Sequence, residues 1–122
     1  MAKRAQPQRA PQQATDAETA LKTLTAARAA LEEAFDSAVE IEDMRQIQRA
    51  LMAVSNEIVA LLQAGIIAQA EAYKPQTDAI LVARADIKAI QDRIGRITTI
   101  IDKAAKIADA LGQVLKVLPK LA

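Results

Sequence analysis

Hydrophobic residues recur at alternating steps of three and four along most of the chain, which is the spacing of one face of an α-helix. The strongest run has twelve apolar positions without interruption: Ile80, Ala83, Ile87, Ile90, Ile94, Ile97, Ile101, Ala104, Ala108, Leu111, Leu115 and Leu118. A repeat of this length is typical of a coiled-coil seam. It predicts one helix over about 78–118, which needs a facing partner to bury its apolar face.

A second run predicts that partner. Its positions are Met44, Ile47, Leu51, Val54, Ile58, Leu61, Gly65, Ala68 and Ala72. They indicate a helix over about 40–73 that ends before Pro75, because proline lacks a backbone N–H and disfavours helix in the preceding residue. A turn over 74–77 would then make the two helices a long antiparallel hairpin.

A shorter helix is predicted before this hairpin, over about 16–37. Thr15 and Glu18 have the spacing of a capping box. The apolar positions that follow are Ala17, Leu21, Leu24, Leu31, Phe35 and Ala38.

Extending this first stripe would place Glu42 and Arg45 in the core, so we expect a break near 36–43. Ser37 and Glu40 form a second possible capping box there, and a new helix would start near Ala38. One bent helix over 16–73 is the alternative.

The predicted fold class is therefore all-α, a three-helix bundle or coiled coil. Beside the seam of the last helix, the flank becomes apolar at Ile100, Ile107 and Val114. The first helix should pack at this open end of the hairpin. With 122 residues, the chain fits one domain over 15–122, preceded by a disordered basic tail over 1–14.

Composition argues against catalysis. The chain has no Cys and no His, and only 2% of its residues are aromatic. No Gly-rich phosphate loop is present, and no activated nucleophile is recognisable. We predict a non-enzymatic protein without cofactors.

A cytoplasmic location is the default because no signal peptide is visible, although export without a signal stays open.

Surplus apolar surface is predicted at the hairpin tip, where a two-helix tip cannot bury the side chains of Leu62, Ile66, Ile67, Leu81 and Val82. Such clusters usually mark an interface. We expect a protein–protein interaction or assembly module that forms homo-oligomers or docks on another helical protein, which it could inhibit. Rim charges would set register or partner choice: Arg84, Lys88, Arg93 and Arg96.

Two other functions stay open. The acidic stretch Glu32, Glu33, Asp36, Glu40, Glu42, Asp43 could hold Mg²⁺ in an all-α hydrolase, and it resembles the metal-binding pattern of dimeric all-α pyrophosphatases, although a solvated face is the simpler interpretation. The segment from Ala110, with Lys116 and Lys120, resembles a membrane-surface helix. It would make the chain a membrane-active amphipathic helical protein that forms pores or binds lipid surfaces, which we place ahead of the hydrolase as the alternative function.

Nucleic acid is a weaker possibility. The net charge is only +1, so no strong field draws the chain to an anionic partner. The tail cations Lys3, Arg4 and Arg9 could contact phosphates, but three charges provide weak, salt-sensitive affinity. Alternating apolar repeats occur in many unrelated proteins, so the pattern names no family.

Overall fold

The computed structural model describes residues 15–119, which form four helices: α1 (Ala17–Ser37), α2 (Ile41–Gln63), α3 (Asp78–Ile97) and α4 (Ile101–Val117). The all-α prediction is confirmed for these residues. The predicted tail over 1–14 lies outside them.

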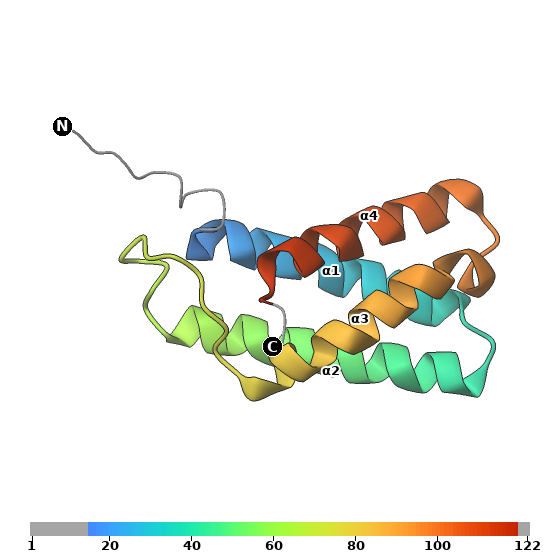
Figure 1. The fold of residues 1–122 in the computed structure, drawn as a ribbon, viewed down its shortest axis with the longest axis horizontal. Coiled ribbons are helices and arrows are strands. Elements are labelled where there is room, and N and C mark those ends of the chain that lie inside the picture. Colours follow the sequence, from blue (N-terminus) through green and yellow to red (C-terminus); the bar gives the residue numbers. More distant parts are fainter. Residues whose placement is uncertain (1–14, 120–122) are drawn as a thin grey trace.

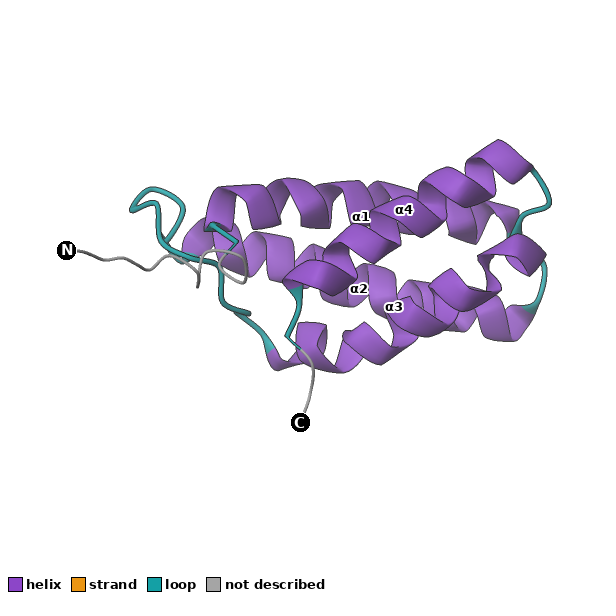
Figure 2. Cartoon of the chain, turned by 45° about the horizontal axis from the view of Figure 1, so that its top comes forward, coloured by secondary structure: helices purple, strands orange, loops and turns teal. Residues whose placement is uncertain are grey.

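The helices run alternately in opposite directions and lie side by side in two pairs (Figures 1 and 2). Each packs mainly on two others: α1 on α2 and α4, and α3 on α2 and α4. This is the arrangement of an up-down-up-down four-helix bundle. One end, which we call the short-loop end, carries the connections 38–40 and 98–100. The opposite, long-loop end carries residues 64–77.

The prediction of one helix over 78–118 is wrong, because the chain reverses at 98–100 and forms α3 and α4 instead. Residues 97–101 are five consecutive β-branched side chains, Ile-Thr-Thr-Ile-Ile, which are weak helix formers. Thr98 adopts an extended conformation. Its Oγ1 also accepts a hydrogen bond from the N–H of Ile100 at 3.4 Å, which offers the backbone an alternative to the helix.

The buried face of α4 consequently differs from the predicted seam. Ile101 is 82% exposed, while the buried positions are Ile107, Leu111, Val114 and Leu118. Two of these, Ile107 and Val114, belong to the apolar flank that the sequence assigned to a contact with the first helix. In the structure α4 does pack along α1, as well as along α3.

The second helix is shorter than predicted and ends at Gln63. Gly65 has a φ of +81°, a left-handed conformation that glycine adopts without strain and that ends a helix. The loop then attaches to the start of α1. The N–H of Ala17 donates to the Glu71 carbonyl at 3.0 Å, and the N–H of Tyr73 donates to the Thr15 carbonyl at 2.7 Å.

A break between the first two helices is present, over residues 38–40, but neither predicted capping box forms. The N-cap of α1 is Asp16, whose carboxylate accepts the N–H of Thr19 at 2.7 Å. This hydrogen bond from the backbone of Thr19 is the main cause that lowers the pKa of Asp16 from 3.8. Glu40 is the N-cap of α2 and makes no side-chain capping bond.

The core between the helices is almost wholly aliphatic. Its largest fully buried apolar side chains are Leu24, Leu31, Ile47, Leu61, Ile80, Ile87, Ile90, Ile107 and Leu111. Alanines line much of α1, at Ala17, Ala20, Ala27, Ala30 and Ala34. Small side chains let neighbouring helices approach closely.

Candidate interaction surfaces

A shallow apolar groove lies between α2 and α3 on the outside of the bundle, with a volume of about 540 Å³. Its lining residues are Arg49, Met52, Ala53 and Asn56 on α2, and Asp78, Ala79, Val82, Ala83 and Asp86 on α3. Ala53 and Ala83 are buried, whereas Met52 and Val82 are 59% and 66% exposed. The groove therefore has a floor of small side chains and two large apolar side chains that face solvent.

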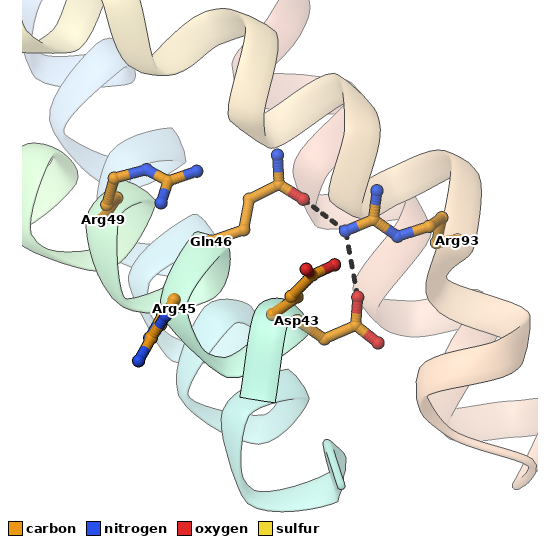
Figure 3. Close-up of a pocket in the computed structure, with 6 residues that line it drawn as sticks. Asp43, Arg45, Gln46, Arg49 and Arg93 are labelled. Atoms are coloured by element: carbon orange, nitrogen blue, oxygen red, sulfur yellow. Dashed lines mark hydrogen bonds and ion pairs between the residues drawn. The ribbon is translucent and has the colours of Figure 1, made fainter. Parts of the chain in front are cut away.

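A row of polar contacts continues from one end of this groove along the same two helices. Figure 3 shows the part of this row around Gln46 and Arg93. Asp86 accepts from the Arg49 guanidinium at 3.2 Å and from the Gln46 amide at 2.9 Å. Arg93 reaches from α3 to α2, where it donates to Asp43 at 3.0 Å and to the Gln46 carbonyl oxygen. These contacts fix how α2 and α3 lie against each other.

A charged pocket of about 450 Å³ surrounds this row, lined by Glu42, Asp43, Arg45, Gln46, Arg49 and Arg93. Its three guanidinium groups do not converge on one point. Arg93 is held by Asp43 and Gln46, Arg49 pairs with Asp86, and Arg45 points away from both (Figure 3). An anion that needed two or three arginines together would find no such arrangement here.

A second groove, of about 620 Å³, lies between α3 and α4 and is lined by Arg84, Lys88, Leu115, Lys116 and Leu118. The Nε of Arg84 is buried without a hydrogen-bond partner among the described residues. Lys88 pairs with Asp92, one turn along α3, at 2.6 Å. This surface is basic and partly apolar.

The long-loop end holds a buried carboxylate that sequence reasoning missed. Glu57 on α2 is 0% exposed. One of its oxygens accepts from the Tyr73 hydroxyl at 2.6 Å and from the N–H of Gln76 at 2.7 Å. The other accepts from the N–H and the hydroxyl of Thr77, each at 2.9 Å.

This arrangement ties the loop to the bundle at the point where α3 begins. Thr77 is the N-cap of α3, and its hydroxyl also accepts the N–H of Ile80 at 3.3 Å. The carboxylate thus lies near the positive end of the α3 dipole. An acid at a helical position flanked by Val54, Ile58 and Leu61 was the one signal in the sequence that could have revealed it.

The five residues predicted to form an interface at the hairpin tip do not form one exposed patch. Leu62 and Val82 are exposed, and Ile67 and Leu81 are partly buried against the core. Ile66 is buried, so its prediction as a surface contact is wrong. The loop folds back there, held by Glu71, whose N–H donates to the Ile66 carbonyl at 2.9 Å.

The predicted rim charges have several different environments. Arg93 and Lys88 are engaged in ion pairs within the chain, Arg84 lines the basic groove, and Arg96 is exposed near the short-loop end. Sequence reasoning therefore missed that Arg93 links two helices of its own bundle. The tail residues Lys3, Arg4 and Arg9 lie outside the described residues, as does Lys120.

The acidic stretch is divided between two helices. Glu32, Glu33 and Asp36 are exposed on α1, Glu42 is exposed at the start of α2, and Asp43 pairs with Arg93. Over residues 15–119, no three acidic side chains gather in a way that could hold a metal ion.

Within residues 15–119, none of the helices combines the length and the apolar content needed to cross a bilayer.

Comparison with known proteins adds no relative to this geometry: the chain matches no family model, no curated protein and no solved structure.

Proposed function

We propose that this chain is a non-enzymatic interaction module that receives an amphipathic helix of another protein in the groove between α2 and α3. The observation that carries the proposal is the pair of large apolar side chains, Met52 and Val82, exposed along a groove with an alanine floor. Apolar side chains that face solvent in a concave surface gain free energy when a partner covers them.

A helix is the partner that suits the shape of this groove. Its lining positions pair in antiparallel register, with Arg49 near Asp86 at one end and Asn56 near Asp78 at the other. The lining spans eight residues of α2 and nine of α3, which is about 12–14 Å, or a little over two helical turns. A docked helix would fill it with apolar residues at positions i, i+3 or i+4, and i+7.

The acidic side chains at the ends of the groove determine which charge the partner helix should carry there. Asp86 is already neutralised by Arg49. Asp78 is exposed in the first turn of α3. We expect the partner to carry a lysine or arginine beside the last apolar anchor, where it can reach the Asp78 carboxylate.

The lining of the groove also supports a binding role over a catalytic one. The chain has neither Cys nor His, and the only ionisable side chains in the groove are Arg49, Asp78 and Asp86. Recognition through buried apolar area needs no general base or nucleophile.

A library of amphipathic helical peptides tests the proposal directly. Selection on the full chain should enrich peptides with the apolar spacing above and a basic residue at one end. The variant Met52→Glu/Val82→Glu should weaken the selected peptides by about tenfold or more, because two charges would enter an apolar contact. Titration by fluorescence anisotropy measures this change.

The matched control is Ala105→Glu/Gln113→Glu, which adds the same two charges at exposed positions of α4. It should leave peptide affinity within about twofold. Equal binding to the groove variant and to the unmodified chain would overturn the proposal, and so would a selection that enriches no helical peptide.

A further inference from the structure

The short-loop end of the bundle carries a concentrated apolar surface. Four large side chains are exposed there: Val39 by 85%, Ile41 by 62%, Ile100 by 59% and Ile101 by 82%. They are half of the eight large hydrophobic residues that the structure exposes over residues 15–119. The topology brings them together, since the connections 38–40 and 98–100 lie at the same end in both views (Figures 1 and 2).

The local chain cannot cover these side chains. Each connection has only three residues between helices, which is too short to fold back over the bundle end. A longer connection can do so: residues 64–77 fold back at the opposite end and place their own Ile66 in the core. These four side chains therefore stay exposed unless something beyond the described residues covers them.

The charges around this apolar surface differ between its two corners. The corner between α1 and α2 is mainly acidic, with Asp36, Glu40 and Glu42 all exposed and one exposed cation, Arg45, a turn further along α2. The corner between α3 and α4 carries exposed Arg96 and half-buried Lys103, together with one acid, exposed Asp102. The neighbouring Asp43 is already paired with Arg93.

We propose that the short-loop end is the interface of a symmetric, end-to-end homodimer. A two-fold axis through the middle of this end, perpendicular to the line that joins the two connections, places the acidic corner of one copy against the basic corner of the other, twice. A surface of a single charge, such as an anionic membrane, would instead meet repulsion at one corner. The split pattern is thus complementary to itself.

The size of the surface predicts the strength of this dimer. The exposed parts of four aliphatic side chains amount to a few hundred Å², which is at the upper range for a monomer. With the charged rim, the buried area would reach the lower range of specific interfaces, about 600 Å² for each copy. We expect dissociation at roughly micromolar concentrations.

The shape of the dimer is also predicted. The longest helix, α2, has 23 residues and is therefore about 35 Å long. End-to-end association gives a rod of about 70 Å, whereas side-by-side pairing would give a shorter and thicker particle. Small-angle scattering distinguishes these two shapes.

The first experiment is sedimentation velocity on the full chain from roughly 0.1 μM to 1 mM, a range that brackets a micromolar dissociation constant. The unmodified chain should shift from monomer to dimer. Ile100→Asp/Ile101→Asp should remain monomeric while its helicity stays unchanged, because both side chains already face solvent. The groove variant Met52→Glu/Val82→Glu should still dimerise, which separates this inference from the proposed function.

A charge-reversal pair gives the sharper test. Glu40→Lys/Glu42→Lys makes both corners basic, and Arg96→Glu/Lys103→Glu makes both corners acidic. Each variant alone should be monomeric, because like charges then meet across the interface. An equimolar mixture should form a heterodimer.

Three outcomes would overturn the inference. One is an unmodified chain that stays monomeric up to 1 mM, because we take a dissociation constant of roughly 1 mM as the weakest association of interest. Another is an Ile100→Asp/Ile101→Asp variant with unchanged mass. The last is a charge-reversed mixture that does not associate although both variants are folded by circular dichroism.

Discussion

The two ends of the bundle differ in how far their own connections cover them. Every helix end exposes backbone groups and apolar side chains that need cover. At the long-loop end, residues 64–77 place their own Ile66 in the core and attach to the buried carboxylate of Glu57. At the short-loop end, two three-residue connections leave Val39 and Ile101 almost fully exposed. The length of the connection therefore decides which end is closed by the chain itself.

This contrast has a consequence for stability and for association. The long-loop end should tolerate few substitutions, because its polar contacts are buried and mutually dependent. The short-loop end should tolerate many without unfolding, although they would change association.

The largest effect should follow removal of the buried carboxylate. Glu57→Ala leaves the N–H groups of Gln76 and Thr77 and the Tyr73 hydroxyl without an acceptor. Each such loss costs about 1–3 kcal/mol, so the free energy of unfolding should fall by at least about 3 kcal/mol in urea denaturation. Glu32→Ala, at an exposed position of α1, should change it by less than about 0.5 kcal/mol. A loss below about 1 kcal/mol for Glu57→Ala would show that the loop is held by other contacts.

The next effect compares apolar side chains at the two ends. Ile66→Ala removes a buried side chain and should cost about 2–4 kcal/mol. Ile101→Ala removes an exposed one and should be neutral within about 0.5 kcal/mol, measured below the concentration of association. Equal losses for both variants would contradict the assignment of a closed end and an open end.

The single tyrosine reports on the closed end as pH changes. Burial, followed by the hydrogen bond to Glu57 and its negative charge, raises the pKa of Tyr73 well above its ordinary value of 10.0. The folded state therefore disfavours tyrosinate. Its contribution to stability is fully present below pH 10 and is lost as pH rises above the pKa of the unfolded chain, which stays near 10.0.

The absorbance of tyrosinate measures the pKa of Tyr73 directly, because the chain has only one Tyr and the whole signal comes from it. Folded protein should titrate above pH 10, and protein in denaturant should titrate near the ordinary value of 10.0. Tyr73→Phe should lose no more than about 1.5–3 kcal/mol at neutral pH and should show a smaller alkaline loss. A folded-state titration near pH 10 would mean that the hydroxyl is not held by Glu57.

The smallest effects are expected at two glycines. Gly65→Ala forces a side chain into a left-handed conformation at the start of the long loop and should cost about 1 kcal/mol. Gly95→Ala lies within α3 with open space around its Cβ position and should stabilise the fold by about 0.5–1 kcal/mol. Thermal unfolding measures both changes. A lower melting temperature for Gly65→Ala and a higher one for Gly95→Ala would support the left-handed turn at Gly65 and the open helical position at Gly95, and shifts in the same direction would refute one of the two.

Local sequence alone determined that the chain is helical and where most helices begin or end. Alternating apolar steps located α1 and the starts of α2 and α3, and the phase slip after Phe35 located the first break, because both signals depend only on near neighbours along the chain. The reversal at 98–100 was hidden because the apolar spacing continues in phase through the turn. The run of β-branched residues was its only trace.

Only the tertiary structure decided which surfaces are covered. Glu57 is buried because donors 16–20 residues later return to it, and Ile66 is buried because the loop folds back on α1 and α2. Val39 and Ile101 have the same apolar chemistry but lie at connections too short to cover them. Burial depends on contacts between distant segments, which periodicity along one segment does not encode.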